Sequence, residues 1–223
     1  MWWDWSKAGR LNSEGKPITE AGQYGKNKYN GKKGEFRWEK NVVPEYFWFN
    51  GSLEYHLLPE EISPQKQPIA INKVVGNKTD PNSRIYPFKV HRGKQPYDTE
   101  LNQMVNVHLF GSKESGAYWK NYDWQEAIQV GQEYMDLPFS GEYDFIETKY
   151  FFQITHMVAP KEDSLRCSAC HSSNGRLANL SGIYIPGRDK SSVLDTIGWL
   201  ASIAALLGVV LHGILRKTLK KKN

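Results

Sequence analysis

Two cysteines and a histidine form the chemically most informative cluster in this chain of 223 residues. Cys167 and Cys170 are its only cysteines, two residues separate them, and His171 follows directly. At this spacing two thiols can bond to the two vinyl groups of a c-type haem while the histidine binds the iron. A redox dithiol needs no histidine at that position, and a zinc site needs four ligands, with more cysteine or histidine nearby. The motif therefore predicts one haem c, attached through Cys167 and Cys170, with His171 as the proximal iron ligand.

Histidines outside the motif are weaker candidates. His156 lies eleven residues before the first cysteine, so the chain between them can wrap around a haem edge. It is a candidate distal ligand of this haem or of a neighbouring one, or else a hydrogen-bonded structural histidine. Met157 competes for the same role, and a methionine would raise the reduction potential relative to two histidines. His91 has no cysteine motif nearby, and the residues alone favour a surface or capping role. We interpret His56 and His108 as structural.

An apolar segment near the C-terminus predicts a transmembrane helix. Residues 197–215 carry no charge, and a helix of that length is about 28 Å long, close to the hydrocarbon thickness of a bilayer. We predict a span at 194–216, followed by a basic tail at 217–223. The positive-inside rule places this tail in the cytoplasm and residues 1–190 in the periplasm. The expected location is therefore the inner (cytoplasmic) membrane, with a single pass and membrane lipid around the helix.

One face of this predicted helix carries small residues and a histidine. A stripe of small residues is typical of helix packing in membranes. His212 on that face is a candidate ligand of a b-type haem shared with a quinol-linked membrane cytochrome; the alternative is a histidine hydrogen-bonded near the membrane boundary. The residues of the stripe are Gly198, Ala201, Ser202, Ala205, Gly208 and His212.

Composition and charge exclude some classes of function. The formal net charge is +5, and much of the excess lies in the C-terminal tail, so nucleic acid is not an expected partner. The first 190 residues are rich in aromatic residues, glycine and proline but poor in aliphatic runs, so a bound haem would add hydrophobic bulk to a thin core. Residues 1–5 lack the features of a secretory signal. Since haem c is attached after export, we expect the chain to be the C-terminal piece of a longer protein.

Local patterns predict few regular elements. Asp123 is a plausible N-cap for a helix that continues to about Met135. A short helix is expected around the cysteine motif. The segments dense in glycine, proline, asparagine, serine and lysine, predicted to be irregular, are 6–34 and 59–83. Extended structure is an open expectation, with ambiguous periodicity, for 37–50 and 143–154.

Several motifs in order connect this chain with a known family. They are found at residues 2–5, 41–51, 87–92, 137–143, 156–162 and 167–176. Taken together, residues 1–185 resemble the C-terminal portion of the octahaem tetrathionate reductase family of multihaem c-type cytochromes. The joint run is far more specific than any one of its motifs.

This resemblance implies a multihaem cytochrome c-like fold, mainly α with extensive irregular loops and few short strands, plus the C-terminal transmembrane helix. It also implies a periplasmic wire of packed haems that leads to an active-site haem with a lysine ligand, where tetrathionate, nitrite or hydroxylamine is reduced. Distal histidines in such proteins come from remote segments. His91 therefore becomes a candidate ligand of a haem attached elsewhere, and His156 a stronger candidate for a distal ligand.

The chain also departs from the family. It carries one haem motif instead of a full set, and the segment with the lysine-ligated haem is absent, so no catalytic residue can be assigned. The expected function is electron transfer, as the membrane-anchored C-terminal part of a periplasmic multihaem oxidoreductase whose remaining haem-bearing portion is the main partner. The alternatives are a stand-alone monohaem membrane cytochrome, acting as a carrier or docking anchor without catalysis, and a non-functional fragment.

Overall fold

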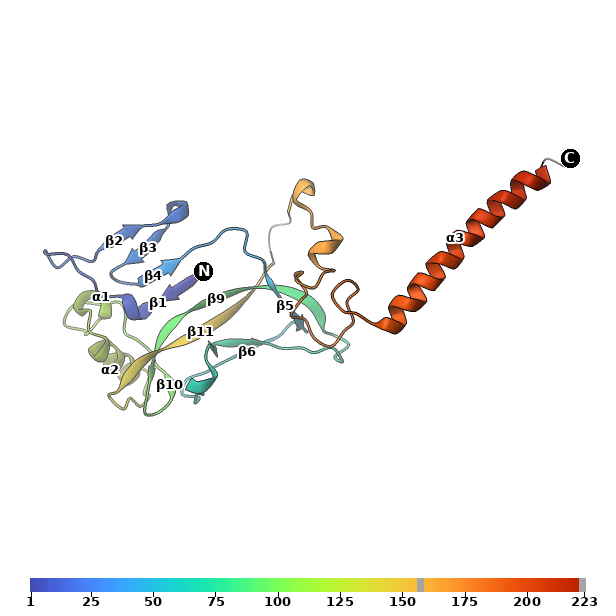
Figure 1. The fold of residues 1–223 in the computed structure, drawn as a ribbon. Coiled ribbons are helices and arrows are strands. Elements are labelled where there is room, and N and C mark those ends of the chain that lie inside the picture. Colours follow the sequence, from blue (N-terminus) through green and yellow to red (C-terminus); the bar gives the residue numbers. More distant parts are fainter. Residues whose placement is uncertain (156–158, 221–223) are drawn as a thin grey trace. The chain divides into compact units, whose positions relative to one another are not determined.

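The computed structural model describes residues 1–155 and 159–220. The chain divides into two compact units, Met1–Val158 and Ala159–Asn223. The first unit contains the β-sheets and two short helices, and the second contains the cysteine motif and a long C-terminal helix (Figure 1).

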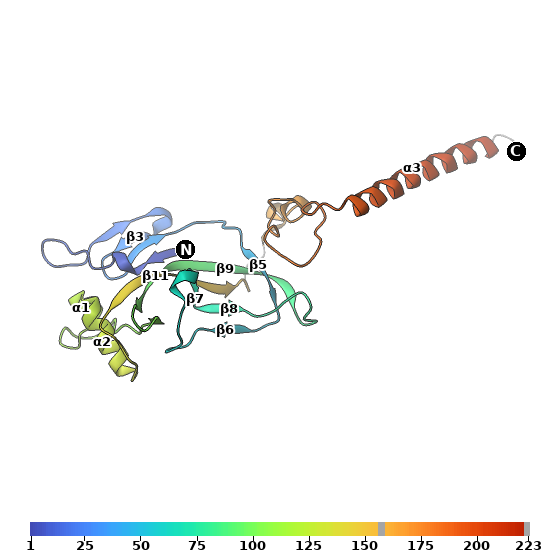
Figure 2. The ribbon, with the colours of Figure 1, turned by 60° about the horizontal axis from the view of Figure 1, so that its bottom comes forward.

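The first unit is built on a mixed sheet of nine strands. The strand order is β2-β3-β4-β1-β9-β11-β7, and β5 and β10 also pair with β9. A separate antiparallel pair is formed by β6 (Leu53–Tyr55) and β8 (Asn72–Val74) (Figure 2). The strands of the large sheet are β1 (Trp2–Asp4), β2 (Thr19–Ala21), β3 (Asn27–Asn30), β4 (Gly34–Arg37), β5 (Glu45–Phe49), β7 (Ile69–Ala70), β9 (Arg84–Asp98), β10 (Gln103–Met104) and β11 (Tyr143–Gln153).

The prediction of a mainly α fold with few short strands is wrong. Among the described residues the α-helices are α1 (Tyr118–Asn121), α2 (Trp124–Tyr134) and α3 (Ser192–Lys220), whereas β9 alone spans 15 residues. β9 pairs with β11 along the whole length of β11, from Tyr143 opposite Asp98 to Gln153 opposite Phe88. Aromatic and β-branched side chains favour such a pleated surface. The glycine and prolines of β9 hid it in the sequence, because these residues usually mark loops.

Two segments predicted to be irregular also contain strands. β2 and β3 lie within 6–34, and β7 and β8 lie within 59–83. These strands have two to four residues each, too short for alternation to stand out from the surrounding polar sequence. The open expectation of extended structure is met by β5 and β11.

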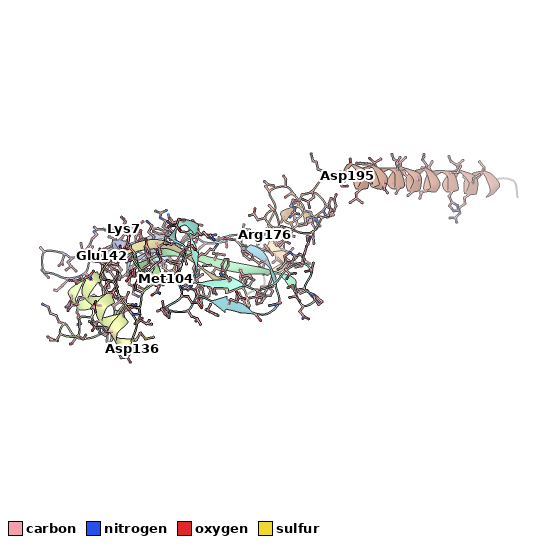
Figure 3. The ribbon with its side chains drawn as sticks, turned by 90° about the horizontal axis from the view of Figure 1, so that it is seen from below. Lys7, Met104, Asp136, Glu142, Arg176 and Asp195 are labelled. Atoms are coloured by element: carbon pink, nitrogen blue, oxygen red, sulfur yellow. The ribbon has the colours of Figure 1, made fainter. Side chains whose placement is uncertain are left out.

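Aromatic rings form much of the core. Phe49, Phe88 and Phe151 are buried together, and the ring centroids of Phe49 and Phe88 are 5.2 Å apart in an edge-to-face arrangement. Such rings bury a large apolar area per residue and add favourable edge-to-face contacts. A second cluster has aliphatic side chains, including Met104 of β10, which Figure 3 labels. Aromatic packing therefore compensates for the scarcity of aliphatic runs.

The predicted helix after Asp123 is confirmed. The Asp123 carboxylate caps α2 by accepting a hydrogen bond from the backbone N–H of Glu126 at 3.0 Å. The buried face of this amphipathic helix consists of Ala127, Ile128, Gly131 and Gln132.

The second unit ends in the long helix α3. Its segment Ser192–Thr218 is long and apolar enough to cross a membrane. Asp195, labelled in Figure 3, is an acidic residue in its first turn. The helix includes the whole of the predicted span at 194–216.

Candidate functional site

The two cysteines and the histidine share one tight turn of the second unit. A 3-10 turn runs through Cys167–Ala169, and a preceding one through Lys161–Asp163, in place of the single short helix expected there. The N–H of Cys170 and that of His171 both donate to the carbonyl of Cys167, at 3.1 and 2.8 Å. Both cysteines are free, Cys167 being exposed and Cys170 half-buried. One hydrogen-bonded backbone turn thus carries both free cysteines and the histidine.

One nitrogen of the His171 ring is held by the backbone. Nδ1 lies 3.0 Å from the carbonyl oxygen of Pro186. A carbonyl oxygen can only accept, so Nδ1 is the donor, and in the neutral ring Nε2 keeps the lone pair. Metal-binding histidines are commonly oriented in this way, since the second hydrogen bond fixes the tautomer and raises the basicity of the ligating nitrogen.

The chain around His171 is packed closely enough to fix its position. The N–H of Arg176 donates to the carbonyl of Ala169 at 2.7 Å, which closes the loop after the motif. Gly187 has a φ of +84°, and a Cβ atom there would lie 2.4 Å from the carbonyl oxygen of His171. Only glycine fits both the conformation and the contact.

Sequence reasoning missed the segment that orients the histidine. Pro186 and Gly187 lie well after the motif, and their roles depend on a loop that returns to it. A proline followed by a glycine is a turn signal that marks such a return. It does not indicate which side chain the loop will contact.

These residues fit a c-type haem better than the alternatives weighed from the sequence. A porphyrin supplies four nitrogen ligands for the iron. The protein therefore needs to provide only one histidine for one face of the porphyrin and two thiols for covalent attachment. Among residues 1–155 and 159–220 there is no group of three or more histidine, cysteine, aspartate and glutamate residues that could hold a metal ion. The described chain therefore gives no support to a zinc site. The assignment of Cys167, Cys170 and His171 to haem stays a prediction.

His91 lies in the other unit, on β9, beside an apolar groove. The groove has a volume of about 440 Å³, and its aromatic lining includes Trp3, Trp5, Tyr150 and Phe152. The ring centroid of His91 is 4.5 Å from that of Phe152. Burial, and then the positive charges of the chain's N-terminus and of a nearby lysine, lower the pKa of His91 below its ordinary value. The ring is therefore held in the neutral form that binds metals.

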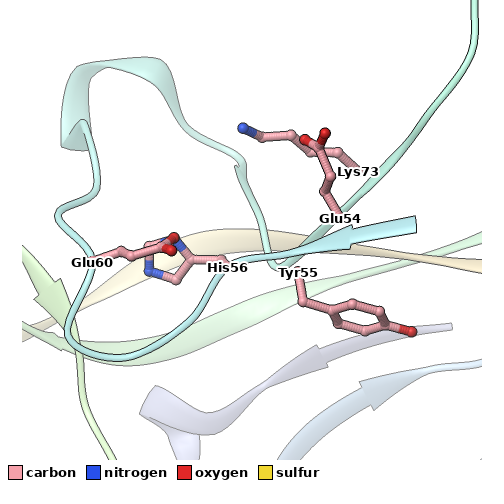
Figure 4. A pocket seen from close by; sticks show the side chains of 5 residues that line it. All are labelled: Glu54, Tyr55, His56, Glu60 and Lys73. Carbon is pink, nitrogen blue, oxygen red and sulfur yellow. The ribbon is translucent and has the colours of Figure 1, made fainter. Parts of the chain in front are cut away.

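The remaining histidines are placed as follows. His156 lies outside the described residues, so its predicted role as a distal ligand stays a prediction. His56 lines a polar pocket of about 290 Å³ together with Glu60 and Lys73 (Figure 4), and its Nδ1 lies 3.5 Å from Oε2 of Glu60. His108 lies 3.2 Å, through Nε2, from the hydroxyl of a serine. Each of these two histidines therefore has a polar neighbour, and the structural roles expected for both stay predictions.

Comparison with known proteins relates the chain to cytochromes. The family described as "Cytochrome c bacterial" matches residues 1–174. The crystal structure of octaheme cytochrome c from Shewanella oneidensis is similar to this chain, with 38% sequence identity and a TM-score of 0.69. The match covers 79% of this chain and 40% of that chain, so this chain spans less than half the length of its relative. A search of curated proteins found no match. Because the family match extends over most of the sequence and includes the cysteine motif, this chain belongs to the bacterial cytochrome c family.

Proposed function

We propose that this chain transfers electrons through one haem c bound covalently to Cys167 and Cys170. The observation that carries the proposal is the backbone turn that joins both free cysteines to His171, whose Nδ1–H is hydrogen-bonded to the carbonyl of Pro186. This arrangement leaves Nε2 as the available ligand atom. Membership of a cytochrome c family supports the same conclusion.

In this function the protein would attach the haem, orient it and adjust its reduction potential. The haem, when bound, supplies an iron that changes between ferrous and ferric states. Cys167 and Cys170 fix its edge, while His171 presents one nitrogen whose basicity depends on the hydrogen bond at the other. His171, through this second hydrogen bond, would influence how easily such an iron gains an electron.

We further propose that the chain works as the C-terminal part of a periplasmic multihaem oxidoreductase. Its relative is an octahaem cytochrome of which it covers 40%, so the remaining haem-bearing portion would lie on another segment or polypeptide. His91 fits this proposal as the ligand of a haem attached elsewhere, since its neutral ring lines an apolar groove of the size and aromatic character that suit a porphyrin edge. The active-site haem, and the reduction of tetrathionate, nitrite or hydroxylamine, belong to that missing portion.

The proposed location is the inner membrane. Helix α3 supplies the anchor, and the basic residues at its C-terminal end favour a cytoplasmic C-terminus with residues 1–190 in the periplasm. Electrons would then be exchanged with a quinol-linked cytochrome in the same membrane, for which His212 is a candidate contact.

Covalent haem is tested by expressing the full chain in a periplasm that matures c-type cytochromes. A pyridine haemochrome assay should give one haem c per chain, and the double replacement Cys167→Ala with Cys170→Ala should abolish it. Ser168→Ala is the matched control, because it lies between the cysteines and preserves their spacing. Covalent haem that survives the double replacement would refute the proposal, as would a wild-type chain that is mature, folded and free of haem.

A second candidate is a stand-alone monohaem carrier. It is favoured by the combination of one haem motif and a membrane helix in the same chain. Purification in mild detergent from the native membrane distinguishes the two. Co-purification of further covalent haem, beyond one per chain, supports the multihaem assembly, and a stoichiometry of one with no haem-bearing companion supports the carrier.

A further inference from the structure

Arg188 of the second unit has an acceptor for every donor of its guanidinium group. Its side chain is 12% exposed. Arginine has five N–H donors in a fixed planar fork. The acceptors are the carbonyl oxygens of Leu177 (2.9 Å), Leu180 and Ile183 (2.9 Å) and both carboxylate oxygens of Asp189 (2.8 and 2.7 Å). All hydrogen-bond donors of this side chain are thus paired, in a chain segment with little regular structure. We call the group formed by Arg188, Asp189 and these three carbonyl oxygens the latch, because it holds neighbouring backbone segments together.

Asp189 ties the same latch to the backbone on its other side. Its Oδ2 accepts a hydrogen bond from the N–H of Ile185 at 2.7 Å, in addition to the bond from Arg188. The Arg188 guanidinium, and then the Ile185 N–H, hold the pKa of the Asp189 carboxyl below its ordinary value. The carboxylate therefore stays ionised at neutral pH and available to both partners.

The latch encloses the two residues that contact His171. Pro186 and Gly187 lie between Ile185, which is pinned by Asp189, and Arg188, which is pinned by the carbonyls behind it. The carbonyl of Pro186 accepts from Nδ1 of His171, and Gly187 packs against the backbone of His171. Both ends of this short loop are thus fixed, so the position of the accepting carbonyl is fixed as well.

We propose that Arg188 and Asp189 are positioning residues for His171: they hold the Pro186 carbonyl against Nδ1 and thereby set the basicity of the nitrogen that binds iron. This inference rests on the proposed function. Outer hydrogen bonds of this kind orient metal-binding histidines, and their loss changes the properties of the metal. A stronger Nδ1–H···O bond makes the imidazole a better electron donor, which favours ferric iron and lowers the reduction potential.

Lysine cannot replace Arg188 in this role although it keeps the charge. An ammonium is a compact point charge, whereas the latch uses the planar fork in several directions at once. Arg188→Lys therefore separates geometry from charge. Asp189→Asn makes the complementary change, because the amide keeps the shape and one acceptor oxygen while it loses the charge and one acceptor.

The first experiment uses the haem-loaded full chain in detergent. In Arg188→Lys and in Asp189→Asn we expect covalent haem to be retained, the midpoint potential to move to a more positive value, and the axial-ligand bands of the spectrum to shift. Arg216→Lys, near the C-terminal end of α3, is the matched control in the same unit, and its potential and spectrum should equal those of the wild type. Wild-type potentials and spectra in both latch variants would overturn the proposal.

The second experiment does not depend on haem attachment. In the full chain with Cys167→Ala and Cys170→Ala, labelled with ¹⁵N-histidine, nuclear magnetic resonance should show His171 as the Nδ1–H tautomer. Adding Arg188→Lys should produce a mixture of tautomers with no change in the other described histidines. A His171 tautomer that is unchanged in the folded variant would refute the positioning role. Absence of covalent haem from the wild-type protein would instead refute the proposed function.

Discussion

Replacing Gly187 by alanine tests the packing around the haem motif at a single atom. The added Cβ would lie 2.4 Å from the carbonyl oxygen of His171, and ordinary contacts begin at 3.4 Å, so one segment must move by about 1 Å. The bond from Nδ1 of His171 to the Pro186 carbonyl is 3.0 Å long, and a displacement of about that size breaks it. The φ of +84° adds strain for any residue with a Cβ.

The magnitude follows from these two contributions. A left-handed conformation destabilises a non-glycine residue by about 1–2 kcal/mol, and a typical hydrogen bond contributes about 0.5–1.5 kcal/mol. We therefore expect Gly187→Ala to lower the free energy of unfolding of the haem site by about 1.5–3.5 kcal/mol. The assay is a denaturant titration of the haem-loaded chain, followed by the Soret absorbance, together with the midpoint potential.

The control is Gly15→Ala. Gly15 also has a positive φ, +74°, but a Cβ there would meet no atom within 4 Å. It should introduce the conformational strain in the first unit while leaving the Soret transition and the potential unchanged. If Gly187→Ala unfolds with the wild-type Soret transition and keeps the wild-type potential, the reasoning about the loop and His171 is wrong.

Three further predictions concern other parts of the chain. Asp123→Ala removes the cap of α2 and should lower the free energy of unfolding by about 1 kcal/mol in a urea titration, whereas Asp123→Asn should remain close to wild type; equal loss in both would contradict a capping role. Burial lowers the pKa of the His91 imidazole, so the folded state binds a proton at this ring less readily than the unfolded chain does. The free energy of unfolding is therefore highest above the pKa of the unfolded chain and falls as the pH drops from that pKa to the lower pKa of the folded state. His91→Gln should therefore flatten the dependence of Tm on pH between about 7 and 5, and parallel curves would count against it. Leu206→Lys places a charge in the middle of α3 and should disfavour membrane insertion by about 3 kcal/mol, measured as the fraction that resists carbonate extraction; Leu206→Ile is the control, and unchanged retention of the lysine variant would argue against a spanning helix.

The cysteine motif, the helix after Asp123 and the apolar helix α3 could be recognised in the sequence because each depends on local spacing. The cysteine motif needs only its own residues, and the capped helix after Asp123 shows its period within a few turns. The apolar helix α3 likewise carries its signal in an unbroken run. The conformation expected for each of these segments therefore does not depend on which other segments it packs against.

The sheet was missed because its strands depend on distant partners. β1 has three residues, and it is held in the sheet by β4 and, in parallel, by residues 92–94 of β9. No local sequence pattern indicates which distant strand will pair with β1. The loop that orients His171 was missed for the same reason, since Pro186 acts through a backbone oxygen, which is independent of side-chain type.

The pairing of β1 with β9 also has a consequence for the order in which parts of the protein fold. Contacts between residues so far apart in the sequence make folding slow, because a long loop must close before they form. All strands of the nine-stranded sheet lie within residues 2–153, so every strand that takes part in this slow step precedes Cys167 in the sequence. Among the described residues, the segment with the cysteines and the apolar helix α3 contribute no strand to this sheet. Strand pairing in the sheet therefore does not need the segment in which the two cysteines lie.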